Sequence, residues 1–243
     1  MKTAGKYVFF STGLILVALH LSLWIQDNHA FSVKNAIVEG ASLLTEEEIL
    51  KIVQTQANAY IFEADLSNIE RQLERLPQVK HVRVSRVFPS SIRIEIKERE
   101  PVAILVDNGV WGVDSEGVLI PRMPARHGMD YPVIVGFRLK QHLVGRPIRH
   151  KKVRFLASFL SQLKKDNPAV YHMISEITMN ELLGVYMRMV SYNLPVVLGK
   201  KDLLKKCQKL ELAMTYLMSA NTLDTVRYVD LRFEDRIILK RRT

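Results

Sequence analysis

A nearly unbroken apolar segment close to the N-terminus restricts the organisation of this 243-residue chain more than any other feature. It covers the 19 residues Tyr7–Ile25, and His20 is its one strongly polar member. A helix of this length spans about 28 Å, close to the thickness of a bilayer's hydrocarbon core. The run is longer than the apolar region of most signal peptides, and Asn28-His29-Ala30 is a poor cleavage site. The sequence therefore favours an uncleaved membrane anchor over a cleaved signal peptide.

The charges that flank this run predict its direction across the membrane. Lys2 and Lys6 precede the run, and the next Lys or Arg is Lys34. Because positive charges stay on the cytoplasmic side, we expect residues 1–6 to be cytoplasmic and the chain after the run to be exported. No later segment approaches about 18 apolar residues without a charge. The sequence thus predicts a single-pass protein of the inner (plasma) membrane, with one transmembrane helix at residues 7–25.

The overall charge favours an acidic partner. Lys and Arg number 35 against 25 Asp and Glu, which gives a formal net charge of +10. Because most of this charge lies on the exported part, we expect lipid head groups, a wall polymer or an acidic protein face, and no nucleic acid. The one cysteine, Cys207, excludes an intrachain disulfide and a multi-cysteine metal site.

The first exported segment predicts a compact α+β unit with the order β-α-α-β-β. Thr45 and Glu48 have the spacing of a capping box, which marks a helix start. Ile92, Ile94 and Ile96 alternate with charged residues, as is typical of a half-buried strand. The expected elements are a strand at 31–38, helices at 45–55 and 65–76, and strands at 79–87 and 92–97.

A charged stretch that ends in proline, Glu98–Pro101, predicts a domain boundary. After it the pattern changes to short strands, and Asn108-Gly109 favours a tight hairpin turn. Two longer helices are expected at 151–165 and 202–219, which gives a mixed or antiparallel β domain with two helices. The expected strands are 102–106, 110–113, 118–120, 131–135, 173–177, 184–190, 195–198, 226–233 and 236–240.

No residue pattern indicates catalysis. The seven histidines do not fall at metal-ligand spacing, and Asp114–Gly117 is interpreted as a hairpin turn and not as part of a calcium loop. Cys207 lies on the apolar stripe of its helix, where we expect a buried core residue and not a nucleophile. Glu98 and Glu100 alternate with a basic residue at a domain junction, where solvated ion pairs are expected. The sequence therefore predicts no catalytic residue, no metal and no cofactor.

Two basic helix faces allow two interpretations. They are either solvated surfaces of amphipathic helices or sites that capture anionic head groups. Their lysines and arginine are Lys151, Lys152, Arg154, Lys164 and Lys165 on one helix, and Lys200, Lys201, Lys205, Lys206 and Lys209 on the other.

The order of these segments resembles the FtsQ/DivIB family of bacterial cell-division proteins. Each segment alone is weakly specific, but the ordered set covers essentially the whole chain. The segments that carry the resemblance are the anchor, the start of the first unit at 31–40, Leu76–Val84, Phe88-Pro89, Ile94–Ala103, Val113–Gly117 and Tyr228–Phe233.

The resemblance implies a POTRA domain at residues 31–99 and an FtsQ-type β domain at 101–243. It also implies a non-enzymatic divisome scaffold at the septum, which links early and late septum-assembly proteins. The implied partners are small single-span division proteins like FtsB (DivIC) and FtsL, with other divisome proteins reached through the POTRA domain. Two alternatives are a POTRA component of an envelope export machine and a wall-polymer-binding protein.

In this family the contact with FtsB involves the last strands. A terminal strand leaves unpaired backbone groups that a partner segment can fill by strand addition. Arg232 can hold a carboxylate, and Phe233 can fill an apolar pocket. The alternative is that Leu231 and Phe233 are plain residues of the sheet. The resemblance assigns the contact to Asp230, Leu231, Arg232, Phe233, Glu234, Arg236 and Ile238.

Overall fold

The chain forms two compact units, residues 1–98 and 99–243. The computed structural model describes residues 12–20, 31–54, 59–121, 131–234 and 236–242. Residues 12–20 are helical, but the expected cytoplasmic tail and both ends of the expected membrane helix lie outside the described residues. Among the described residues, no helix has the length and apolar character that a membrane crossing requires.

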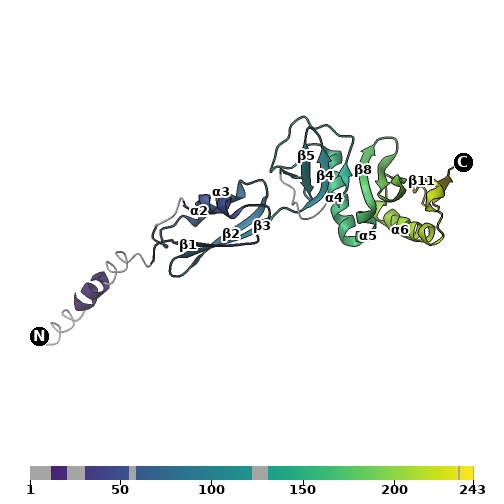
Figure 1. Cartoon of the computed structure of the whole chain (residues 1–243). Helices are drawn as coiled ribbons and strands as arrows, with labels where there is room; N and C mark the ends of the chain where they lie inside the picture. Colours follow the sequence, from purple (N-terminus) through teal and green to yellow (C-terminus); the bar gives the residue numbers. More distant parts are fainter. Residues whose placement is uncertain (1–11, 21–30, 55–58, 122–130, 235, 243) are drawn as a thin grey trace, which may run out of the picture. The chain divides into compact units, whose positions relative to one another are not determined.

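The first unit has the expected β-α-α-β-β order (Figure 1). Its three strands form one sheet in the order β1-β3-β2, in which β1 and β3 are parallel and β2 and β3 antiparallel. The two helices pack the apolar side chains of their inner faces against this sheet. The elements are β1 (Asn35–Glu39), α2 (Glu46–Val53), α3 (Leu66–Glu74), β2 (Val79–Val87) and β3 (Ser91–Glu98).

Local sequence signals explain both helices of this unit. Thr45 caps α2, and its capping box with Glu48 is complete in both directions, as predicted. Asp65 caps α3 by accepting a hydrogen bond from the backbone N–H of Asn68. Ile69 and Leu73 on the inner face of α3 are fully buried in the core.

The first strand is shorter than predicted. It begins at Asn35 and not at residue 31, because the preceding residues pair with a different segment. The Val33 N–H donates to the Ala59 carbonyl, and the Ile61 N–H donates to the Phe31 carbonyl, at 2.9 and 2.8 Å. Residues 31–33 thus belong to the end of the unit at which β1 begins.

The second unit contains one nine-stranded sheet with the order β12-β11-β10-β9-β8-β7-β4-β5-β6. Most neighbours are antiparallel, but β4 and β7, β7 and β8, and β10 and β11 run parallel. The strands are β4 (Pro101–Val106), β5 (Val110–Asp114), β6 (Leu119–Ile120), β7 (Val133–Ile134), β8 (Ile174–Asn180), β9 (Gly184–Met189), β10 (Pro195–Gly199), β11 (Val226–Asp230) and β12 (Ile238–Arg241).

Two long helices, α4 (Lys151–Asp166) and α6 (Leu203–Ser219), pack on this sheet (Figure 1). The short helix α5 (Pro168–Met173) was not predicted. Asn167 ends α4 and also caps α5, because its side chain accepts a hydrogen bond from the Val170 N–H. The buried Tyr171 on α5 donates its hydroxyl proton to the Val102 carbonyl at 2.9 Å, which fastens α5 to β4.

The last strands also differ from the prediction. A strand was expected to run to Phe233, but β11 ends at Asp230. The strand β11 lies between β10 and β12, so its two edges are paired. The expected final strand at 236–240 is β12, and it begins two residues later, at Ile238.

Candidate functional site: the C-terminal sheet edge

Strand β12 forms one edge of the nine-stranded sheet. Its neighbour among the described strands is β11, with which it pairs antiparallel from Asp230–Ile238 to Val226–Arg241. An edge strand presents backbone N–H and C=O groups that a further strand can pair with. Of the seven residues that the sequence assigned to the partner contact, Ile238 lies on this edge strand.

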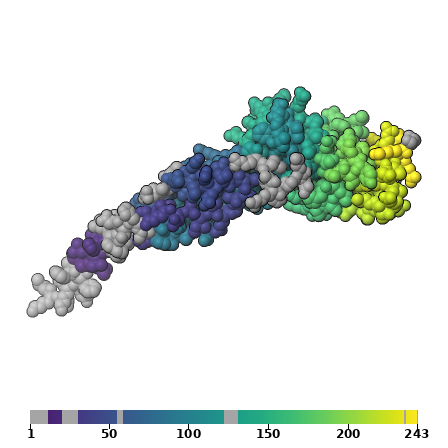
Figure 2. Space-filling view, viewed as in Figure 1, coloured from purple at the N-terminus to yellow at the C-terminus, as the bar shows by residue number. Residues whose placement is uncertain are grey.

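The side chains of β12 are exposed and carry both apolar surface and positive charge. Ile238 and Leu239 are 37% and 39% exposed, and successive residues of a strand point to opposite faces of the sheet. Lys240 and Arg241 complete the strand, and residues 236–242 contain no acidic residue. Figure 2 shows the C-terminal residues, in yellow, at the surface of the molecule. The edge thus offers a strand, two apolar side chains and a basic rim.

A side-chain ion pair shapes the turn that leads from β11 towards β12. The Arg232 guanidinium donates from Nε and Nη2 to the Asp230 carboxylate, with Nη2–Oδ2 at 2.7 Å, and the Arg232 backbone N–H donates to Oδ1 at 3.0 Å. Burial of Asp230 would raise its pKa, but these hydrogen bonds and the charges of Arg232 and Lys206 outweigh burial and lower the pKa below its ordinary value. The same pair raises the pKa of Arg232. Asp230 is therefore held ionised and tied to its own turn.

Lys206 on α6 supports this turn from the interior. It is buried, and its ammonium donates to the Leu198 carbonyl at 3.0 Å. Gly199 sits beside it in the left-handed region, and a Cβ there would lie 3.2 Å from the Arg232 Cγ. A side chain at this position would therefore press on the ion pair as well as strain the backbone.

The seven residues that the sequence assigned to partner binding fall into two groups. Asp230 and Leu231 have buried side chains, and the Leu231 N–H donates to the Val197 carbonyl at 2.8 Å, so both belong to the interior of the domain. The other five are exposed and follow the chain from the turn onto β12: Arg232, Phe233, Glu234, Arg236 and Ile238.

The sequence interpretation missed the outer part of the edge. Leu239, Lys240 and Arg241 lie on β12 itself, and Arg242 follows it with its N–H bonded to the Thr225 carbonyl. The signal was present, because an apolar pair followed directly by a basic run at the end of a chain fits an edge strand that must stay soluble. The contact that the resemblance assigned ends at Ile238 and therefore left these residues out.

The basic face of α6 borders the turn. The Lys209 ammonium donates to the Glu234 carbonyl. Asp202, Lys205, Lys206, Lys209 and Glu234 line a cavity of about 140 Å³ there. One of the two lysine clusters thus adds positive charge next to the edge.

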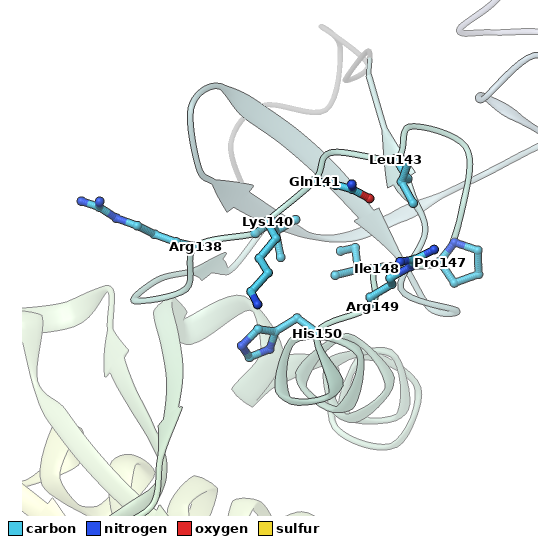
Figure 3. A pocket seen from close by; sticks show the side chains of 9 residues that line it. Arg138, Lys140, Gln141, Leu143, Pro147, Ile148, Arg149 and His150 are labelled. Atoms are coloured by element: carbon cyan, nitrogen blue, oxygen red, sulfur yellow. The ribbon is translucent and has the colours of Figure 1, made fainter.

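A second basic feature lies in the loop before α4. A cavity of about 490 Å³ is lined by Arg138, Leu139, Lys140, Gln141, Leu143, Pro147, Ile148, Arg149 and His150. Lys140 extends towards His150, whereas Arg138 points away from the cavity (Figure 3). The mixture of aliphatic walls and cations fits an anionic group that carries some apolar surface.

Three residues that were weighed as possible reactive or metal-binding groups have structural contacts in the fold. Cys207 is buried, and burial raises the pKa of its thiol to about 12. The Asp114 carboxylate accepts hydrogen bonds from the Glu116 and Val118 N–H groups and lies 2.6 Å from the Arg99 guanidinium, so it closes the hairpin turn. The Glu98 carboxylate accepts hydrogen bonds from the backbone N–H groups of residues 42–44.

Comparisons with known proteins agree with this architecture. The family model described as "POTRA domain, FtsQ-type" matches residues 31–99, and the one described as "Cell division protein FtsQ/DivIB, C-terminal" matches residues 103–232. The cell division protein FtsQ of Syntrophotalea carbinolica is 26% identical over 97% of this chain and 83% of its own length. FtsQ of Geotalea daltonii is 26% identical over 87% of this chain and 76% of its own length, and DivIB of Clostridium acetobutylicum is 26% identical over 90% and 85%.

Proposed function

Because the chain belongs to the FtsQ/DivIB family of cell-division proteins, we propose that it is a non-enzymatic scaffold of the divisome. Its C-terminal domain binds a small single-span division protein, of the FtsB/DivIC or FtsL type, by adding a strand of that partner to β12. Through this contact it links early and late septum-assembly proteins. The observation that carries the proposal is the basic, exposed edge strand at the C-terminus.

The exposed groups of β12 predict the composition of the partner segment. Backbone pairing with β12 supplies affinity that does not depend on sequence, and the side chains add selectivity. Ile238 and Leu239 offer one apolar contact on each face of the extended sheet. Lys240, Arg241 and Arg236 favour an extended partner segment that carries Asp or Glu.

The exposed turn residues extend this surface. Phe233 is 48% exposed and provides an aromatic anchor beside the strand. Arg232 already holds Asp230, so it positions the turn and presents the remaining N–H groups of its guanidinium outwards. Asp230 and Leu231 act indirectly, because they hold the turn in place from the interior.

The anchor and the domain limits complete the proposal. Residues 7–25 cross the inner membrane once, residues 1–6 stay in the cytoplasm, and the domains at 31–99 and 101–243 lie outside at the septum. The length of the apolar run and the flanking lysines support this topology. The POTRA domain is available for a further divisome protein.

A charge-reversal experiment tests the partner edge. The full chain in nanodiscs is titrated by calorimetry with an acidic segment of an FtsB-like partner, and the variant is Lys240→Glu with Arg241→Glu. Like charges along the edge should weaken binding at least about tenfold. The matched control, Lys140→Glu with Arg149→Glu, makes the same change in net charge away from β12. Unchanged affinity for the β12 variant, or an equal loss in the control, would contradict the proposed edge.

The cavity before α4 favours a second candidate function, binding of an acidic wall polymer. The same two variants separate the candidates, because polymer binding at this cavity should weaken with Lys140→Glu and Arg149→Glu and persist in the β12 variant. The measurement is retention of the full chain on an anionic wall-polymer column over a salt gradient. Equal retention of the control variant and the unmodified chain would exclude this function.

A further inference from the structure

Four aromatic side chains form a continuous row at one end of the POTRA domain. The ring centroids of Phe31 and Tyr60 are 6.3 Å apart, those of Tyr60 and Phe62 are 5.2 Å apart, and those of Phe62 and Phe88 are 5.2 Å apart. Phe62 and Phe88 are 52% and 58% exposed. We call this row, Phe31, Tyr60, Phe62 and Phe88, the aromatic ladder.

The ladder is held in place by hydrogen bonds from three separate segments. The Ile61 N–H donates to the Phe31 carbonyl. The Arg86 guanidinium donates to the carbonyls of Ile61 at 2.6 Å, Phe62 at 3.2 Å and Ala64 at 3.0 Å. An arginine therefore fixes the backbone that presents Phe62 outwards. Two large apolar side chains displayed on a braced backbone indicate a contact surface.

Strand register places the ladder at one end of the three-stranded sheet. Asn35, at the start of β1, pairs with Ser91, at the start of β3, and Ser91 also pairs with Val87, at the end of β2. Phe88 directly follows Val87, the last residue of β2, and so lies at this same end, in the turn between β2 and β3. The opposite end of the sheet carries Glu98, from which the chain leaves the domain. The ladder thus marks the end at which the chain arrives.

The chain length between the apolar run and the ladder is short. Five residues separate Ile25 from Phe31, and six backbone steps reach at most about 21 Å. If residues 7–25 cross the membrane, the first ladder residue lies within that distance of the end of the transmembrane helix. This step rests on the membrane anchor of the proposed function.

We propose that the aromatic ladder inserts into the interface of the lipid bilayer and docks the POTRA domain on the membrane surface. Exposed aromatic and apolar side chains partition into the head-group region, where they leave water without entering the hydrocarbon core. Lys34 and Arg86 lie at the same end of the sheet and can face lipid phosphates, while the nearby Glu63 is also exposed. Because the aromatic side chains supply the contact and the three charged residues add a net charge of only +1, the docking needs no anionic lipid and takes place on phosphatidylcholine alone.

The proposal also has a functional consequence. A flexible tether would let the POTRA domain turn freely above the membrane, whereas a docked ladder fixes which end faces the bilayer. The opposite end, at Glu98, then always points away from the membrane. Partner proteins would meet the sheet and helices of this domain in one orientation, which lowers the entropic cost of assembly.

A fluorescence experiment tests the docking in the full chain. Its two tryptophans, Trp24 and Trp111, are replaced by phenylalanine, and one tryptophan is introduced at Phe88→Trp. The control introduces it instead at His81→Trp, an exposed position of β2 near the opposite end of the same sheet. Each protein is reconstituted into phosphatidylcholine vesicles whose acyl chains carry bromine near the head group. We expect bromine to quench the tryptophan at position 88 at least about threefold more than the one at 81.

The possible results separate the ladder from the anchor. Strong quenching at 88 that falls when Phe62→Ser and Tyr60→Ser are added supports the proposal. Absence of quenching at position 88 would overturn the proposal, and it is the result expected if the ladder served a protein partner. Equal quenching at positions 88 and 81 would also overturn the proposal. Alkaline extraction of the same vesicles tests separately whether the transmembrane helix anchors the protein. Release of the protein by alkali would reject the transmembrane helix, while the quenching at 88 would still decide the ladder.

Discussion

At the scale of single residues, the Asp230–Arg232 pair links the interior of the β domain to its exposed edge. The Asp230 carboxylate is buried and receives three N–H groups from Arg232, two of them from the guanidinium. This arrangement bends the chain out of β11 directly after Asp230. The orientation of Phe233 and the start of β12 therefore depend on the charge of Asp230, even though Asp230 need not contact the partner.

Replacement of Asp230 by Asn should loosen this turn. Hydrogen bonds to a charged group contribute about 1.5 to 3 kcal/mol, and the half-exposed Arg232 reduces this, so we expect a loss of about 1 to 2 kcal/mol in the free energy of unfolding. Partner binding should weaken as well, because the turn positions the exposed residues. Chemical denaturation of the full chain and calorimetry with the partner segment measure the two effects.

The pH dependence of this loss follows from the direction of the pKa shift. The pKa of Asp230 is lowered in the folded protein, so its stabilisation is fully present above the unfolded value of about 3.9. The stabilisation disappears as the pH falls through the lower, folded value. The difference between the unmodified protein and Asp230→Asn should therefore be constant near pH 7 and shrink below about pH 4. A difference that stayed constant down to pH 2 would show that the charge does not hold the turn.

Cys207 should be unreactive in the folded protein. Burial raises the pKa of its thiol to about 12, and the thiolate is the form that reacts with alkylating agents. At pH 8 we expect iodoacetamide to label the folded chain at least about a hundredfold more slowly than the chain in denaturant. Mass spectrometry of timed samples measures the labelling. Rapid labelling without denaturant would mean that α6 leaves the sheet readily.

At the scale of elements, the sequence predicted best where a local signal decides the structure. The Thr45 capping box depends on contacts within a few residues, and α2 and α3 form close to their expected ranges. The turn at Asp114–Gly117 was also predicted, and in the structure the Asp114 side chain accepts hydrogen bonds from the backbone N–H groups two and four residues later. These signals act within one element, so a single chain without relatives is enough to recognise them.

The predictions failed where a distant contact decides. Helix α5 has six residues, too few for a helical period, and its stability depends on the bond between Tyr171 and β4. A continuous strand was expected at 226–233, but β11 ends at Asp230, where the Asp230–Arg232 pair turns the chain away. The local sequence of β12, an apolar pair followed by basic residues, fits an edge strand, but the strand that β12 pairs with depends on the order of strands across the whole domain.

Glu98 should be a structural element of the POTRA domain. Its carboxylate receives the N–H groups of Ser42, Leu43 and Leu44 at 2.8 to 3.0 Å, together with the Ser42 hydroxyl at 2.7 Å. It therefore fastens the segment before α2 to the end of β3. We expect Glu98→Gln to lower the stability of this unit by about 2 kcal/mol, since an amide cannot accept all of these bonds.

The neighbouring acid provides the control for this prediction. Glu100 is exposed and lies in the second unit, so Glu100→Gln should leave the stability unchanged within about 0.5 kcal/mol. Hydrogen exchange of the full chain measures both units separately. Glu98→Gln should speed exchange in residues 31–98 and leave the sheet of residues 99–243 unchanged, because the two units have separate cores. Faster exchange in both units would show that they unfold together.

At the scale of the whole molecule, the described residues present two surfaces suited to binding. The two proposed contacts lie in different units: the aromatic ladder in the first and the β12 edge in the second. Each unit has its own core, so each contact can form without reshaping the other. This division suits a scaffold, which has to hold a membrane and a partner at the same time.

The direction of the chain across the membrane is the expectation on which both contacts depend. Alkaline phosphatase folds only where disulfides form, which is outside the cytoplasm. When it is fused after Thr243, we expect it to be active in cells, because the chain after the apolar run is expected to be exported. We expect Lys2 and Lys6 to set this direction, so Lys2→Glu with Lys6→Glu should lower phosphatase activity at equal protein levels. The control is Lys34→Glu, for which we expect no loss, because this lysine follows the apolar run and its removal only strengthens the bias. An inactive phosphatase on the unmodified chain would place β12 in the cytoplasm, where neither an exported partner nor the outer face of the membrane could reach the two surfaces.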